Sequence, residues 1–206
     1  MKVIQQPLGP VQANCYLVME NHHALIIDPA DILPNLDEIL NQNDCTLDAI
    51  VLTHAHFDHI SGVDKIVNKF GCDVYLNPNE FDFLLDPDLN SSSAFYMDVT
   101  CNANAKPLIE GKNEIAGFEV EAIYCPGHSI GSTVLKIEDC LFTGEVLFQG
   151  SIGRMDLATG SVTSMKQSLK KLYQFNKDYK IYPGHGPTTS LSQEKKWNES
   201  LKYAEI

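Results

Sequence analysis

The chain has 206 residues, of which 44% are hydrophobic, and its formal net charge at pH 7 is −12. This length and apolar content suffice to bury a core, so we expect a single domain over residues 1–206. An acidic surface repels phosphate backbones, so the charge argues against a nucleic-acid partner.

The start of the chain and its cysteines bear on where the protein works. Residues 1–10 begin directly on a strand-like pattern, without the basic and apolar parts of a signal peptide, and no apolar run approaches the length of a membrane span. The six cysteines are scattered and form no C-x-x-C pair, so we interpret them as reduced thiols. We therefore expect a cytoplasmic protein without a membrane partner, in which His and carboxylate side chains provide any metal ligands.

The first half of the chain alternates predicted strands with predicted helices. Apolar runs predict strands at residues 1–10, 11–19, 23–28, 49–53 and 73–77. Apolar residues at helical spacing predict helices over 33–43 and 60–71, the second of which ends at Gly71. Residues 78–106 mix aromatics with Pro, Asn and Ser, so we expect one or two helical turns and a long loop that is functional or mobile.

The second half returns to strands and ends in helices. Strands are predicted at residues 118–125, 132–139, 140–144 and 180–183. Amphipathic patterns predict helices over 162–175 and 192–206. Strands dominate each half and helices lie between them, which predicts an α/β fold with helices packed outside the sheets.

Five of the seven histidines follow strand-like runs. They occur in the segments THAHFDH, CPGHS and YPGHG, as His54, His56, His59, His128 and His185. Rigid strand ends that lead into loops are where proteins often place reactive side chains. Two carboxylates occupy the same kind of position, Asp58 in the first segment and Glu145 in FTGEVLF.

Together these side chains offer more nitrogen and oxygen ligands than one metal ion needs. His54 and His56 are two positions apart, so they project to the same side of an extended segment. Asp58 and His59 follow within one short turn. Zinc usually takes about four ligands, so the set indicates two divalent metals that share a bridging carboxylate. Imidazole and carboxylate ligands without thiolate suit Zn, with Fe or Mn as alternatives.

The motifs THAHFDH, PGHS, TGE and PGHG resemble the signature of the metallo-β-lactamase superfamily over nearly the whole chain, from Asp28 to Thr189. The stretches GEVLFQGSIGRMD and IYPGHGPTTSLSQEKKWN resemble small glyoxalase II-like hydrolases more specifically. The resemblance implies a four-layer αββα sandwich with the metals in a cleft at one edge. It further implies that one metal is held by His54, His56 and His128, and the other by Asp58, His59 and His185.

Glu145 stands where this family has its bridging aspartate. Its side chain is one methylene longer, in a kind of site whose ligand distances are tight to about 0.2 Å. We expect Glu145 still to reach the metals, and the alternative is that one metal binds weakly.

The resemblance predicts a metal-dependent hydrolase whose metal-held hydroxide cleaves a thioester, of the S-acylglutathione class, or a related ester. Asp58 is the candidate catalytic residue, because it would orient the hydroxide as well as bind metal. Phe95, Tyr96 and Arg154 are candidate substrate-binding residues, with core packing as the alternative for the two aromatics.

Two further carboxylates are candidates to support the ligands. They are Asp28, at a strand end, and Asp156, near Arg154. The alternative for both is a structural ion pair.

Three other functions stay open from the sequence. A persulfide dioxygenase of the same superfamily would hold one iron with His54, His128 and Glu145. A nuclease of the same fold is disfavoured by the net charge of −12. In a metal-binding module without catalysis, Glu145 would mark the lost activity. We expect a small-molecule substrate as the partner, and the sequence leaves the oligomeric state open.

Overall fold

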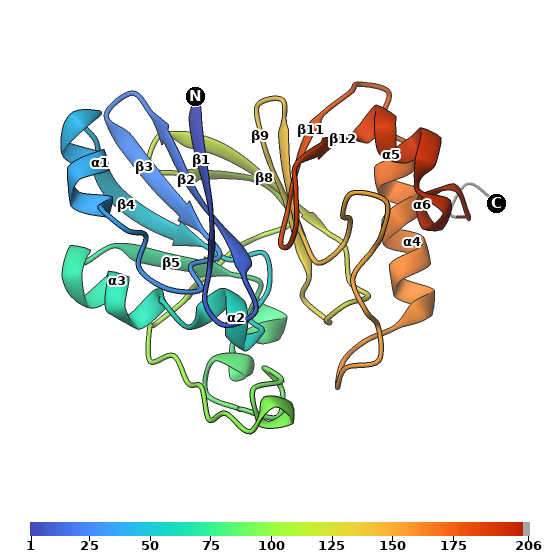
Figure 1. Ribbon diagram of the computed structural model, residues 1–206, viewed down its shortest axis with the longest axis horizontal. Coiled ribbons are helices and arrows are strands. Elements are labelled where there is room, and N and C mark those ends of the chain that lie inside the picture. Colours follow the sequence, from blue (N-terminus) through green and yellow to red (C-terminus); the bar gives the residue numbers. More distant parts are fainter. Residues whose placement is uncertain (204–206) are drawn as a thin grey trace. The chain divides into compact units, whose positions relative to one another are not determined.

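The computed structural model describes residues 1–203 (Figure 1). The chain divides into two compact units, which are described separately. Unit 1 comprises residues 1–108 and 114–118, and unit 2 comprises residues 109–113 and the chain from residue 119 onward. The expectation of a single domain over residues 1–206 stays a prediction.

The sheet of unit 1 keeps its strands in chain order (Figure 1). They are β1 (Lys2–Leu8), β2 (Ala13–Glu20), β3 (His23–Ile27), β4 (Thr46–Val51), β5 (Asp73–Leu76) and β6 (Lys106–Pro107). Strands β1, β2 and β3 pair antiparallel, whereas β3 to β6 pair parallel. The carboxyl ends of β3, β4 and β5 therefore meet at one edge of the sheet, where loops commonly hold functional residues.

Helices connect the parallel strands of unit 1. Helix α1 (Leu36–Gln42) links β3 to β4, and α2 (Phe57–Ile60) and α3 (Val63–Phe70) link β4 to β5. The apolar sides of α1 and α3 share a core with alternate residues of the strands. The predicted helix over 60–71 is α3, which begins later than predicted, at Val63, because α2 ends at Ile60 and Gly62 packs against the backbone of Asp31. Gly71 ends α3 at a φ of 69°, as predicted.

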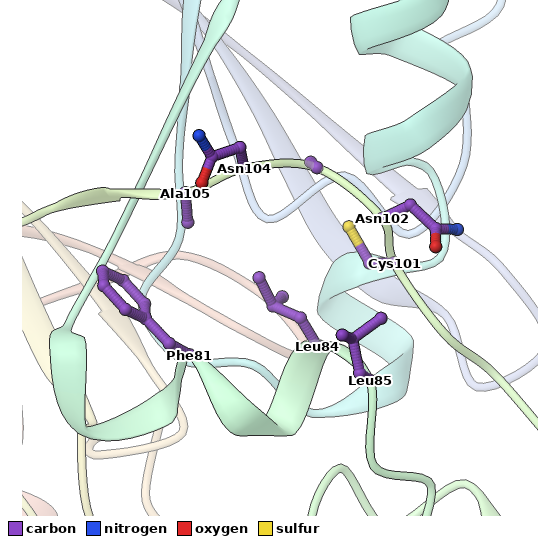
Figure 2. A pocket seen from close by; sticks show the side chains of 8 residues that line it. Phe81, Leu84, Leu85, Cys101, Asn102, Asn104 and Ala105 are labelled. Atoms are coloured by element: carbon purple, nitrogen blue, oxygen red, sulfur yellow. The ribbon is translucent and has the colours of Figure 1, made fainter.

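The irregular segment after β5 contains short 3₁₀ turns, in agreement with the prediction. These are η1 (Pro78–Glu80), η2 (Asp82–Leu84) and η3 (Ser93–Phe95). A shallow pocket lies between the first two turns and residues 101–105 of the same unit. Figure 2 shows Phe81, Leu84 and Leu85 on one side of this pocket and the backbone of residues 101–105 on the other.

The sheet of unit 2 has the spatial order β12-β11-β10-β9-β8-β7. Its strands are β7 (Gly111–Ile115), β8 (Phe118–Tyr124), β9 (Thr133–Ile137), β10 (Cys140–Gly144), β11 (Lys180–Pro183) and β12 (Thr189–Ser190). Most neighbours pair antiparallel, but β10 and β11 pair parallel across the connection that contains α4 (Val162–Tyr173). The carboxyl ends of β10 and β11 therefore lie side by side.

The end of the described chain has a break that the sequence pattern did not predict. Residues 192–206 were predicted as one helix, but α5 (Leu191–Trp197) and α6 (Glu199–Tyr203) are separate. Asn198 lies between them in an extended conformation, and its Oδ1 accepts a hydrogen bond from Leu201 N at 3.2 Å. An Asn side chain competes with the helical backbone in this way, which explains the break. The predicted helical residues 204–206 lie outside the described chain.

Among residues 1–203 the structure has no helix with the length and apolar character that crossing a bilayer requires.

Candidate metal centre

Unit 1 gathers three buried imidazoles in the segment that follows β4. His54, His56 and His59 are each at most 4% exposed. The ring centroid of His54 lies 4.8 Å from that of His56 and 4.3 Å from that of His59. The chain is extended at His56 and then enters α2, so residues on both sides of this turn contribute to one cluster. The Asp58 carboxylate joins the cluster, with Oδ2 at 3.7 Å from His59 Nε2.

Asp28, at the end of β3, fixes the orientation of this cluster. It is 1% exposed, and its carboxylate accepts hydrogen bonds from Thr53 N at 2.8 Å and Thr53 Oγ1 at 2.6 Å. Its Oδ2 also lies 3.0 Å from His59 Nδ1. The Asp28 carboxylate thus lies against Nδ1 of His59, which leaves Nε2 of His59 as the candidate metal-binding nitrogen.

The Thr53 hydroxyl extends the same arrangement to His54. Its Oγ1 lies 3.1 Å from His54 Nδ1. The hydroxyl hydrogen is directed to Asp28, so Oγ1 accepts from His54 Nδ1, and Nε2 of His54 becomes the metal-binding nitrogen. Asp28 therefore makes the supporting contact that the sequence suggested, directly to one candidate ligand and through Thr53 to another.

The sequence reasoning missed Glu80, a supporting residue on the other side of the His-x-His segment. The Glu80 side chain is fully buried, and its Oε2 accepts a hydrogen bond from Ala55 N at 2.6 Å. Ala55 lies between His54 and His56, so this bond fixes the backbone that carries both imidazoles. Glu80 lies in η1, just after the parallel strand β5, and this position is the feature of the sequence that could have indicated its role. Only burial distinguishes Glu80 from the many exposed acidic residues.

In unit 2, His128 follows β8 on a turn that only glycine can form. A Cβ at Gly127 would lie 2.5 Å from the Met165 backbone, and the φ of Gly127 is +148°. His128 is 3% exposed, and its Nδ1 donates to the Arg154 carbonyl oxygen at 2.8 Å. The other nitrogen, Nε2, is thereby left as the candidate ligand. Cys125 packs into the core of this unit, where burial raises the pKa of its thiol to about 12.

Glu145 and His185 face each other at the paired ends of β10 and β11. His185 Nε2 lies 3.6 Å from Glu145 Oε1. The two strand ends are joined by a hydrogen bond from Gly184 N to the Gly144 carbonyl at 2.8 Å. A tight turn then follows β10, in which Val146 N donates to the Thr143 carbonyl. The strand pairing thus brings together a carboxylate and an imidazole that are 40 positions apart in the sequence.

The candidate substrate-binding residues are surface residues. Phe95 is 47% exposed, and its ring centroid lies 5.1 Å from that of Phe57. Tyr96 is completely exposed at a left-handed φ of 57°, so core packing does not explain it. Arg154 forms two hydrogen bonds to Asp156, each 2.7 Å long. Hydrogen bonding from Arg154 lowers the pKa of Asp156 to about 2, so the structural ion pair considered for Asp156 is present.

The side chains in each unit fit divalent metal ions. In unit 1 three buried imidazoles lie together, and one of them, His59, lies beside the Asp28 and Asp58 carboxylates. In unit 2 a carboxylate faces an imidazole. Nitrogen and oxygen donors of this kind suit zinc, iron and manganese. That both sets contribute to one centre stays a prediction.

Comparisons with known proteins agree over nearly the full chain. The family model described as the metallo-beta-lactamase superfamily matches residues 8–185. The chain is 38% identical to the probable metallo-hydrolase YqgX of Bacillus subtilis, with 98% of each chain covered. It is 31% identical to the hydroxyacylglutathione hydrolase GloC of Haemophilus influenzae, with 95% of each chain covered.

Solved structures show the same similarity. The BLEG-1 B3 metallo-beta-lactamase superposes with a TM-score of 0.91 at 38% identity, covering 97% of this chain and 99% of that one. TTHA1623 in a di-iron-bound form superposes with a TM-score of 0.84 at 34% identity, covering 95% of this chain and 98% of that one.

Proposed function

Because the chain belongs to the metallo-β-lactamase superfamily, we propose that it is a hydrolase that uses two divalent metal ions, zinc by preference, to cleave a thioester or a related ester. Membership confirms the family resemblance and the α/β fold class that the sequence motifs predicted. Relatives in this family are named as a probable metallo-hydrolase and a hydroxyacylglutathione hydrolase.

The observation that carries the proposal is the imidazole cluster of unit 1. Burying several imidazoles beside two carboxylates is costly unless a cation is present, because each polar group loses its hydration. Asp28 and Thr53 engage the Nδ1 atoms of His59 and His54, which leaves the Nε2 atoms as donors. Metal-binding histidines characteristically have this second hydrogen bond.

The proposed ligands are those that the motifs indicate. One metal would be held by His54, His56 and His128. The other would be held by Asp58, His59 and His185. Glu145 would be shared by the two metals. Its Oε1 lies 3.6 Å from His185 Nε2, which supports a place for Glu145 among these ligands.

The metals, when bound, would lower the pKa of a water to about 7 and polarise the substrate carbonyl. The protein side chains hold the reacting groups around that water. Asp58, next to His59, would accept a hydrogen bond from the attacking water and so orient it. Asp28 and the Arg154 carbonyl keep the imidazoles in one tautomer throughout, so no ligand has to reorient during the reaction.

A thioester is the proposed substrate because of a resemblance in sequence. The relative in Haemophilus influenzae is named a hydroxyacylglutathione hydrolase and matches this chain over 95% of its length. The exposed Phe95 and Tyr96 are proposed to contact the acyl or thiol part of the substrate. Arg154 is proposed to contact a negative charge of the substrate, since its side chain is 58% exposed. The similarity to a B3 metallo-beta-lactamase favours one second candidate, hydrolysis of a β-lactam ring.

The test combines metal analysis with a substrate panel. Protein purified without added metal is analysed for bound elements and assayed with S-lactoylglutathione, simple aryl esters and a chromogenic cephalosporin. The proposal predicts two equivalents of zinc and turnover of the thioester. A cephalosporin as the preferred substrate would support the second candidate. One equivalent of iron, with oxygen uptake on glutathione persulfide, would support the dioxygenase instead, and bound metal without turnover would indicate a binding module.

Glu145 is tested separately. Glu145→Ala is expected to lower metal content below two equivalents and to reduce kcat/KM more than 100-fold, since even loss of a residue outside the ligand set costs about 10–100-fold. Glu145→Asp, the matched variant with the family's usual residue, should retain metal. If metal content and turnover of Glu145→Ala equal those of the wild type, Glu145 is not a ligand.

A further inference from the structure

Helix α5 carries a buried carboxylate that bonds to the loop containing a candidate metal ligand. Glu194 is 3% exposed, and its Oε2 accepts a hydrogen bond from Gly150 N at 2.7 Å. Its Oε1 accepts from Thr189 Oγ1 at 2.7 Å. Gly150 belongs to the loop over residues 145–154, which is called here the donor loop and which begins at Glu145.

Asn198 strengthens this connection at the end of the same helix. It is fully buried, and its Nδ2 donates to Glu194 Oε2 and to the Ser151 carbonyl, both at 3.0 Å. Oε2 of Glu194 therefore receives one hydrogen bond from the donor loop and one from a residue that itself bonds to that loop. The carboxylate and the amide together hold Gly150 and Ser151 in place.

The donor loop transmits this constraint to the residues around the candidate metal centre. Its ends are tied together, because Gly153 N donates to the Glu145 carbonyl at 3.0 Å. A Cβ at Gly153 would lie 2.0 Å from that carbonyl oxygen, so the backbone at the two ends of the loop is in close contact. The loop ends at Arg154, whose carbonyl receives the His128 hydrogen bond. One loop therefore positions both Glu145 and His128.

We infer that Glu194, assisted by Asn198, is a positioning residue that sets the geometry of Glu145 and His128 for metal binding; this inference rests on the proposed function. Burial of a carboxylate carries a desolvation penalty, and an apolar side chain would anchor α5 at lower cost. The carboxylate orients the groups around it, because its two acceptor oxygens hold Gly150 N and Thr189 Oγ1 at the same time. This fixed direction matters at Glu145, whose extra methylene gives its carboxylate more freedom than an aspartate would have.

The experiment compares Glu194→Gln with a matched variant of a carboxylate that bonds to the same helix, α5. The glutamine keeps the size of the side chain but removes its charge and replaces one of the two acceptor oxygens by an NH2 group, which cannot accept a hydrogen bond. The control is Asp178→Asn, because Asp178 accepts hydrogen bonds at 2.8 Å from Ser192 N and Ser192 Oγ at the start of α5 and, within residues 1–203, makes no hydrogen bond to the donor loop. Both changes replace a carboxylate by an amide at α5.

The readouts are zinc affinity, the visible spectrum of the cobalt-substituted protein, and the Tm of the metal-free protein. Zinc affinity is measured by competition with a chromophoric chelator. We expect Glu194→Gln to bind zinc about 10–100-fold more weakly, the range found when residues that orient metal ligands are lost. Its cobalt spectrum should change as well. Asp178→Asn should leave affinity and spectrum as in the wild type, although its Tm also falls.

Two results would overturn the inference. One is a folded Glu194→Gln protein with wild-type zinc affinity and cobalt spectrum, and the other is an equal loss of affinity in both variants. If Glu194→Gln does not fold, Asn198→Ala provides the same test, because it leaves Glu194 bonded to Gly150 and removes the hydrogen bonds of Asn198 to Ser151, Glu194 and Leu201. A wild-type protein that binds no divalent metal would contradict the proposed function itself, which separates the two failures.

Discussion

The candidate ligands of unit 1 come from one short segment, residues 54–59, whereas those of unit 2 come from the ends of the separate strands β8, β10 and β11. The supports differ in the same way. In unit 1 the side chains of Asp28 and Glu80 bond to the segment directly. In unit 2 a backbone carbonyl, that of Arg154, orients His128.

This difference shows two ways of building one kind of site. A contiguous segment has its ligand spacing fixed by local backbone geometry, so it needs only to be held at the sheet edge. Ligands on separate strands have their spacing fixed by strand pairing and loop packing, so this spacing depends on close contacts between backbone segments. Unit 1 should therefore be most sensitive to loss of polar side chains, and unit 2 to added volume at its glycines.

The largest effect is expected for Asp28→Ala in unit 1. The change removes the acceptor of Thr53 N and Thr53 Oγ1, and each buried donor left unsatisfied costs about 1–3 kcal/mol. It also removes the carboxylate that lies 3.0 Å from His59 Nδ1. We expect the free energy of unfolding of the metal-free protein to fall by about 3 kcal/mol or more, measured by urea denaturation. Zinc affinity should fall as well. A variant as stable as the wild type would show that Asp28 does not organise this segment.

Gly153→Ala tests the packing of unit 2. The added Cβ would meet the Glu145 carbonyl oxygen at 2.0 Å, so the backbone must move. Overpacking of this kind costs about 1–3 kcal/mol. The matched control is Gly150→Ala, at a φ of +70° with no atom within 4 Å of the added Cβ, so it adds backbone strain without a clash. Urea denaturation and metal content should both separate the two variants, and equal behaviour would contradict the close-contact argument.

Glu80→Gln tests the hydrogen bond between Glu80 and Ala55 in unit 1, and we expect a smaller effect. An amide oxygen can still accept from Ala55 N, but a hydrogen bond to a charged acceptor is roughly twice as strong as one to a neutral acceptor. We expect a loss of about 1 kcal/mol in the free energy of unfolding and a measurable decrease in zinc affinity. Unchanged zinc affinity in a destabilised variant would assign Glu80 a purely structural role.

The smallest effect is expected for Asp156→Asn in unit 2. Hydrogen bonding from Arg154 lowers the pKa of Asp156 from 3.8 to about 2. A carboxylate with a lowered pKa in the folded state contributes stability above its unfolded pKa, and this contribution is lost as the pH falls through the folded pKa. The variant and the wild type should therefore differ in stability above pH 4 and converge as the pH falls toward 2. The difference should be small, because the pair is exposed and screened by solvent. A difference that grows below pH 3 would contradict this assignment.

Much of the fold and of the candidate site follows from local sequence patterns. The alternation of apolar residues predicted the longer strands, and a glycine after an amphipathic run predicted the end of α3 at Gly71. Short strands such as β6 and β12 were missed, because two residues carry no periodic pattern. Helices α5 and α6 were predicted as one, since the role of Asn198 as a cap depends on which partners surround it.

The sequence by itself determined which residue types could bind metal and that they follow strands, because ligand chemistry and strand periodicity are both local properties. The tertiary structure alone decided which groups support them. Asp28 reaches Thr53 across 25 positions and Glu194 reaches Gly150 across 44. Such partnerships depend on strand register and on burial, and an acidic residue has the same appearance in the sequence whether it is exposed or holds a loop in place.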